Sequence, residues 1–168
     1  MSDDNPTLAD TIARPPMRET VVKDCVGLVD DEVRSKRGLS GVAIKGAYGT
    51  IKRIKPRFVP EVIDALLDDW LGKLEPYYAK WRASGNGSLT EYLTARSEDV
   101  AEDLLSVTDE RAQKTRHGTA RKLYNKLRGS AKTNVAGAVP KLAARLEKRV
   151  EEANNPPAAQ DAPAEESA

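Results

Sequence analysis

The chain has 168 residues, 39% of them hydrophobic and 32% charged, with a net charge of +1 at pH 7. One cysteine, Cys25, and one histidine, His117, exclude an internal disulfide and any metal site built from several cysteines or histidines. The N-terminus is polar, and no apolar run approaches the ~20 residues that span a bilayer. We therefore expect a cytoplasmic protein without a metal or organic cofactor.

The first part of the chain predicts three helices. Pro15-Pro16 ends a short helix over about 7–14, and Pro16 can begin a second, because proline at the first helical position loses no needed N–H. Apolar residues recur there at helical spacing and predict one buried stripe of Met17, Val21, Cys25, Leu28, Val29 and Val33. Gly38 ends that helix, and Ser40 is the expected N-cap of the next, which stops at Pro56.

The rest of the chain predicts further helices. The longest is expected to begin at Val59-Pro60-Glu61, with Pro76 as a kink or restart. Ser88 and Glu91 have the spacing of a capping box and predict a short helix after the loop at 84–88. A basic helix follows Gly118, with Leu123, Tyr124, Leu127, Ala131 and Val135 on its apolar side, and Val139-Pro140 is expected to open a last helix.

These elements predict an all-α fold, a bundle of six to eight helices in one domain over residues 1–153. From residue 154 to 168 only Ala, Pro, Glu, Asp, Gln, Asn and Ser occur. That composition cannot bury enough apolar surface to order a segment. We therefore predict a disordered acidic tail over 154–168.

An internal similarity links two parts of the chain. Residues 22–32 align without a gap on 100–110, and Lys45-x-x-Tyr48-x-x-Ile51-Lys52 matches Arg121-x-x-Tyr124-x-x-Leu127-Arg128. Two explanations remain open. Either helix-turn-helix units over 22–60 and 100–140 arose by duplication, or two acidic-then-basic helix pairs share a composition.

The segment Leu39-Ser40-Gly41-Val42-Ala43-Ile44-Lys45-Gly46-Ala47-Tyr48-Gly49, with the Val-Pro helix start that follows, resembles a small bacterial helical family known only as a domain of unknown function. The resemblance covers most of residues 7–150. It implies a helical fold and a bacterial origin. No activity or functional residue comes with it.

Charge is segregated along the chain. Residues 36–57 carry seven bases and no acid, 58–110 carry twelve acids and four bases, and 111–150 carry twelve bases against Glu147 alone. Such blocks create local fields that the net charge hides. Either acidic and basic helices neutralise each other across the fold, or a basic face is exposed to an anionic partner.

The charge pattern favours a non-enzymatic binding or scaffolding protein with segregated acidic and basic surfaces. Its partner would be an unidentified protein or an acidic polymer. The alternative is a protein that binds nucleic acid or another polyanion through basic helices over 40–57 and 111–136. Contact with a membrane surface through Ile51, Ile54 and Phe58 is a third interpretation. The candidate contact residues are Lys45, Lys52, Arg53, Arg121, Lys122, Lys126, Arg128 and Lys132.

Enzymatic interpretations are weaker. His117 fits a solvated turn residue better than a general base, and Cys25 lies on an apolar stripe, where thiols are usually inert. The glycines at 41, 46 and 49 do not match the P-loop pattern. We therefore expect no catalytic residue and no metal ligand.

Overall fold

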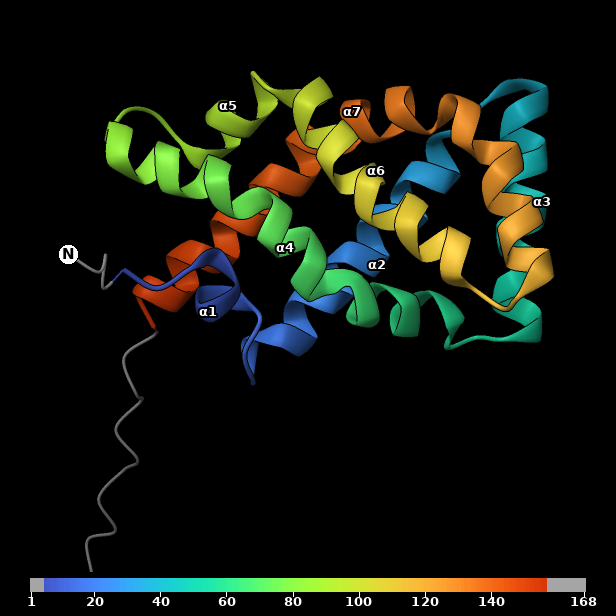
Figure 1. The fold of residues 1–168 in the computed structure, drawn as a ribbon, viewed down its shortest axis with the longest axis horizontal. Helices are drawn as coiled ribbons and strands as arrows, with labels where there is room; N and C mark the ends of the chain where they lie inside the picture. Colours follow the sequence, from blue (N-terminus) through green and yellow to red (C-terminus); the bar gives the residue numbers. More distant parts are fainter. Residues whose placement is uncertain (1–4, 157–168) are drawn as a thin grey trace, which may run out of the picture.

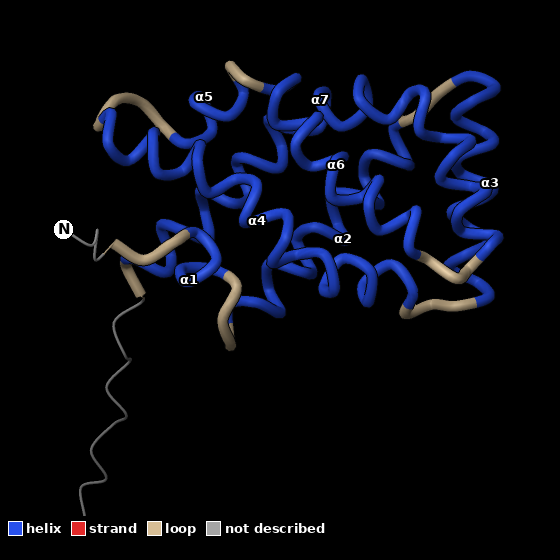
Figure 2. Tube along the Cα trace, viewed as in Figure 1, coloured by secondary structure: helices blue, strands red, loops and turns tan. Residues whose placement is uncertain are grey.

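The computed structural model describes residues 5–156 as an all-α bundle. Within these residues the chain forms seven helices joined by short loops, and no strand (Figures 1 and 2). The helices are α1 (Leu8–Ile12), α2 (Met17–Ser35), α3 (Gly38–Ile54), α4 (Phe58–Ser84), α5 (Leu89–Thr94), α6 (Ser97–Lys114) and α7 (Gly118–Asn154). The predicted class and helix number are confirmed. Asn154 ends α7, and the rest of the predicted tail from residue 157 lies outside the described residues.

The core is formed where α1, α4, α5 and α7 meet. Its completely buried side chains include Leu8 and Ile12 of α1, Leu89 of α5 and Val139 of α7. The stripe predicted for α2 contributes Val21, which is also buried. Figure 1 shows α1 and α3 at opposite ends of the molecule, so this core lies away from α3.

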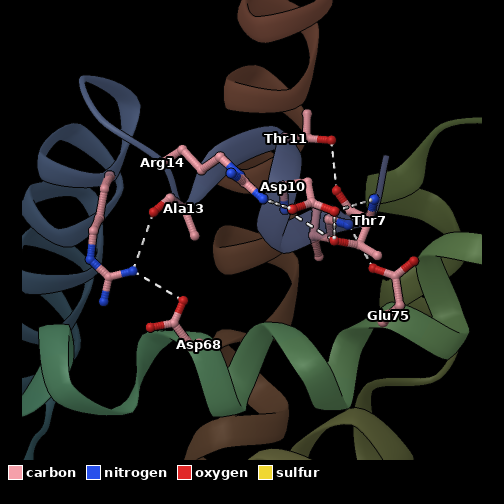
Figure 3. Close-up of polar contacts among 9 residues, drawn as sticks. Thr7, Asp10, Thr11, Ala13, Arg14, Asp68 and Glu75 are labelled. Atoms are coloured by element: carbon pink, nitrogen blue, oxygen red, sulfur yellow. Dashed lines mark hydrogen bonds and ion pairs between the residues drawn. The ribbon is translucent and has the colours of Figure 1, made fainter. Parts of the chain in front are cut away.

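Polar contacts hold the short α1 against α4 (Figure 3). Thr7 and Asp10 form a capping box at the start of α1. The backbone N–H of Leu8 donates to the Glu75 carboxylate at 2.6 Å. These bonds satisfy backbone groups that a five-residue helix would otherwise leave unpaired. They explain how so short a helix keeps a fixed place in the core.

The capping box predicted for α5 is confirmed. The backbone N–H of Glu91 donates to Ser88 Oγ at 3.0 Å, and the backbone N–H of Ser88 donates to Glu91 Oε2 at 3.1 Å. This reciprocal pattern depends only on residues three apart, which is why the sequence could reveal it.

The predicted N-cap of α3 is wrong. The helix begins at Gly38, and Arg37 occupies the cap position without a side-chain hydrogen bond. Ser40 therefore lies inside the first turn. The early start brings α3 close to the end of α2: a β-carbon at Gly41 would lie 2.8 Å from the carbonyl carbon of Lys36. Only glycine fits this approach without a shift of the backbone.

The predicted helix start at Val139-Pro140 is also wrong, because α7 continues through Pro140 to Asn154. At 37 residues it is longer than α4, with 27, which was expected to be the longest. Figure 1 shows that α7 changes direction along its length, and Gly129, Gly137 and Pro140 lie in its central part. Burial of Val139 and Ala143 beside the proline offsets the missing backbone hydrogen bond.

Candidate functional site

An apolar cavity of about 510 Å³ lies among α2, α3, α4, α6 and α7. Most of its wall consists of aliphatic and aromatic side chains. From α2 and α3 these are Cys25, Leu28, Val29, Val33 and Ile44, from α4 Ile63, Leu67, Trp70, Leu71 and Leu74, from α6 Leu104 and Leu105, and from α7 Tyr124, Leu127, Ala131, Val135, Ala138, Val139, Leu142 and Leu146. Its volume falls in the range of ~300–1,000 Å³ typical of small-molecule sites.

The sequence builds this wall from the predicted helix stripes. Cys25, Leu28, Val29 and Val33 share one face of α2 and all line the cavity. The opposing part of α7 includes Ala131 and Ala138. Both side chains are small and fill little of the space between the helices. Stripes expected to pack as a solid core therefore border a space that is partly open to solvent.

The polar groups of the wall are bonded to protein atoms. Trp70 Nε1 donates to the carbonyl oxygen of Leu104 at 3.2 Å, and Thr108 Oγ1 donates to the same oxygen at 3.3 Å. Ser130 Oγ donates to the carbonyl of Leu127 at 3.3 Å. Because these groups already have partners, the interior favours apolar atoms over polar ones.

One charged cluster adjoins the wall. Glu32 and Lys36 both line the cavity, with Lys36 Nζ 3.7 Å from Glu32 Oε2. Lys141 Nζ of α7 lies 2.7 Å from Glu32 Oε1. Two ammonium groups thus share one carboxylate, and the cluster keeps one positive charge. This charge would attract an anion at the wall.

Cys25 lies in the wall as a protonated thiol. Burial, and to a smaller extent the charge of Asp24, raises the pKa of its thiol to about 11. The nucleophilic form of cysteine is the thiolate. Near neutral pH this side chain is therefore an apolar part of the cavity, as its place on the α2 stripe suggested.

Two matching clusters fix α3 and α7 to the helices before them. Tyr48 Oη of α3 donates to Asp30 Oδ1 of α2 at 2.6 Å, and Lys52 Nζ lies 3.0 Å from the same oxygen. On α7, Tyr124 donates to Asp109 of α6, and Arg128 donates to both carboxylate oxygens of Asp109 at 2.7 and 3.0 Å.

The shared spacing in the sequence thus corresponds to shared contacts: in each cluster a tyrosine, and a basic residue four positions later, bind the same aspartate. Tyr48 and then Lys52 keep the pKa of Asp30 below its usual value. Arg128 and then Tyr124 do so for Asp109. The gapless alignment pairs Asp109 with Asp31, whereas the bonded residue is Asp30. The sequence therefore identified the tyrosines and cations but missed one aspartate.

The two segments differ after these clusters. α3 ends at Ile54 and α4 begins at Phe58, whereas α7 continues unbroken to Asn154. The expected likeness of helix boundaries over 22–60 and 100–140 is therefore wrong in its last part. A common origin of the two segments stays a prediction.

The eight predicted contact residues fall into three groups. Lys52, Arg128 and Lys132 bind carboxylates, Lys132 Nζ lying 3.3 Å from Glu102. Arg121 donates to the carbonyls of Gln113 and Thr115 at the turn before α7. The remaining four, Lys45, Arg53, Lys122 and Lys126, are exposed and form no ion pair within residues 5–156.

The basic side chains are thus paired in one part of the fold and exposed in another. The end of α7 neutralises α2, where Arg149 donates to Asp24 at 2.6 and 3.1 Å and Arg145 to Asp31 at 3.2 Å. The exposed sides of α3 and of the first half of α7 keep free cations. The basic surface is therefore smaller than the sequence suggested.

Residues 5–156 contain no group of three or more His, Cys, Asp and Glu side chains placed to hold a metal ion. None of their helices is long and apolar enough to span a bilayer. His117 is the exposed residue before α7.

Comparison with known proteins identifies a family. No curated protein and no solved structure matches the chain. A family model described as a family of unknown function, DUF6918, matches residues 8–150. This range is nearly the one over which the sequence resembled a helical family of unknown function, and the chain therefore belongs to DUF6918.

Proposed function

We propose that this protein is a non-enzymatic binding protein that holds an amphipathic small molecule, with an apolar chain and an anionic head, in the cavity among α2, α3, α4, α6 and α7. The observation that carries the proposal is the cavity itself, about 510 Å³ of space with an almost entirely apolar wall. The proposal keeps the binding role expected from the sequence. It replaces a protein partner by a small amphiphile.

The ligand class follows from the chemistry of the wall. Each methylene group moved from water into such a space contributes roughly 0.8 kcal/mol, so a long hydrocarbon chain gains most. A polar ligand would lose its bonds to water and find few free partners. The positive cluster of Glu32, Lys36 and Lys141 favours a carboxylate or similar anion as the head group.

Tryptophan fluorescence tests this proposal directly. Trp70 lines the cavity, whereas the indole of Trp81, the other tryptophan, donates to Gly87 in the loop before α5. A Trp81→Phe variant reports on Trp70 alone. Titration with a long-chain fatty acid should shift its emission and saturate at one ligand per chain, and the corresponding alcohol should bind more weakly. A spectrum unchanged by all chain lengths would contradict the proposal.

A matched pair of variants locates the site. Ala138→Phe adds a ring to the cavity wall, while Ala144→Phe makes the same change at an exposed position of α7. Ala138→Phe should lower fatty-acid affinity at least tenfold, and Ala144→Phe should not change it. Circular dichroism of both variants checks that the helices remain. Equal fatty-acid affinity in the two variants would show that the ligand does not bind in this cavity.

Polyanion binding is the second candidate function. The exposed cations Lys45, Arg53, Lys122 and Lys126 support it, since no carboxylate in the described residues pairs with them. We expect the protein to be retained on heparin and its retention to fall steeply as the salt concentration rises. A Lys122→Gln/Lys126→Gln variant should be retained less than the original chain. Retention independent of salt would count against it.

A further inference from the structure

Helix α3 carries every large hydrophobic side chain that is strongly exposed in residues 5–156. These are Leu39, Val42 and Ile54, which are 93%, 70% and 79% exposed. Isolated exposed apolar residues are common on protein surfaces and need no explanation. Three such residues on one helix, with none on the other helices of the described chain, indicate an interaction site.

The three side chains lie on one face of α3. At about 100° per residue, Leu39, Val42 and Ile54 fall within roughly one third of the helix circumference. Ala43, Gly46 and Thr50 lie between them on the same face, and so does the cation Arg53. We call the six uncharged residues of this set the outer face of α3.

The opposite side of α3 is already used by the fold. Ile44 lines the cavity, Tyr48 bonds to Asp30 of α2, and Gly41 lies against Lys36. The hydrophobicity of the outer face is therefore not required for the core. α3 lies at one end of the molecule (Figure 1). The six residues of its outer face are all exposed.

The charges around the outer face are all of one sign. No acidic residue occurs from 33 to 60, whereas eight bases do. Arg34, Lys36, Lys52 and Arg57 lie within 4 Å of a carboxylate. Arg37, Lys45, Arg53 and Lys55 have no such partner among the described residues. An exposed apolar face with unpaired cations on it and near it is complementary to a surface with anionic groups outside and apolar groups beneath.

We propose that α3 docks the protein on an anionic lipid surface, with Leu39, Val42 and Ile54 entering the interface and Arg37, Lys45, Arg53 and Lys55 contacting the lipid head groups. A helix with this division of apolar and basic residues lies in the plane of the interface. A second copy of the chain fits less well, because its α3 would bring the same positive charges together. Nucleic acid would leave the apolar residues without a partner.

The inference does not depend on the cavity ligand, although the two sites share α3. Ile44 forms part of the cavity wall on one side of the helix, and the outer face lies on the other. Docking would bring the cavity near the phase in which long-chain amphiphiles dissolve. Failure of either proposal leaves the other standing, because fatty-acid binding is measured without vesicles.

Vesicle sedimentation tests the docking. The full chain should bind vesicles of phosphatidylglycerol and phosphatidylcholine, bind pure phosphatidylcholine vesicles far less, and dissociate partly at high salt. Leu39→Ser/Val42→Ser should lower the partition coefficient at least tenfold, whereas Leu39→Met/Val42→Ile should preserve it. Circular dichroism checks that the variants fold, and substitutions at exposed positions such as these change stability little.

A charge-matched pair separates docking from general attraction. Lys45→Gln/Arg53→Gln should weaken binding roughly fivefold for each charge removed. Lys80→Gln/Lys148→Gln removes the same charge from exposed positions on α4 and α7 and should have little effect. No binding to anionic vesicles would overturn the proposal and leave an acidic protein as the partner of this face. Equal binding by Leu39→Ser/Val42→Ser, or equal loss in the two charge pairs, would overturn it as well.

Discussion

At the end of the molecule that holds α1, apolar side chains of α1, α4, α5 and α7 pack into a buried cluster, whereas α3 at the other end exposes apolar side chains to solvent. The cavity lies between the two, because Leu67, Leu71 and Val139 belong both to the buried cluster and to the cavity wall. The first end buries Leu8, Ile12 and Leu89 almost completely. The second leaves Leu39 and Ile54 exposed. We therefore expect the first end to contribute most of the stability, whereas the proposed lipid contacts lie at the second.

The largest expected effect is a loss of stability at the packed end. Leu89→Ala removes a side chain that is 1% exposed and should cost about 2–5 kcal/mol of unfolding free energy, because it leaves a cavity. Leu39→Ala makes the same change on α3 and should alter the stability by less than ~0.5 kcal/mol. Urea denaturation of both variants measures the contrast. Similar losses in the two would show that α3 is part of the cooperative core.

A pair of glycines in α3 should respond in opposite directions. Gly41→Ala places a β-carbon 2.8 Å from the Lys36 backbone and should destabilise the fold by about 1–3 kcal/mol. Gly46→Ala, where no atom lies within 4 Å, should stabilise it by roughly 0.5–1 kcal/mol, because alanine favours the helix. Thermal unfolding distinguishes the two. A gain in both would mean that α3 does not approach α2 so closely.

The hydrogen bonds of Tyr48 and Tyr124 should contribute similarly to the free energy of unfolding. Tyr48→Phe and Tyr124→Phe each remove one hydrogen bond to an aspartate and should cost about 0.5–1.5 kcal/mol. Tyr92→Phe is the control, since its hydroxyl makes no hydrogen bond to the described residues. Denaturant midpoints of the three variants give the comparison. A loss of stability in Tyr124→Phe alone would mean that the two tyrosines share a spacing but not a structural role.

The smallest effect is a dependence of stability on pH. The pKa values of Asp30 and Asp109 are lowered in the folded state, so the folded state binds fewer protons than the unfolded chain. The two carboxylates therefore stabilise the fold above the unfolded pKa near 3.9. This stabilisation should be lost as the pH falls through their lower pKa values in the folded state. Each contribution is less than ~1 kcal/mol, because both carboxylates are partly exposed.

Unfolding midpoints from pH 6 to pH 2 check the sign of this dependence. An Asp30→Asn/Asp109→Asn variant should lose less stability over that interval than the original chain. Asp99→Asn/Asp69→Asn, which removes two exposed carboxylates, serves as the control and should follow the original curve. An equal loss in the test variant would show that other groups cause the acid sensitivity.

Local patterns were readable from the sequence because they depend on residues one helical turn apart. The stripe of α2, the capping box of Ser88 and Glu91, and the helical class all rest on this short range. The basic side chains Lys52 and Arg128 were identified as a matched pair for the same reason. Their aspartate partners lie 22 and 19 residues away, and that distance has no fixed signature in sequence.

The sequence by itself determined which residues form helices, which faces of those helices are apolar and where charge gathers, since helical periodicity is a local property. Only the tertiary structure decided that α7 continues through Pro140, because the burial of Val139 and Ala143 depends on neighbouring helices. It also decided which charges pair, as Arg149 and Asp24 are 125 residues apart. The cavity belongs to this second class, because its volume depends on the distance between helices that Ala131 and Ala138 leave unfilled.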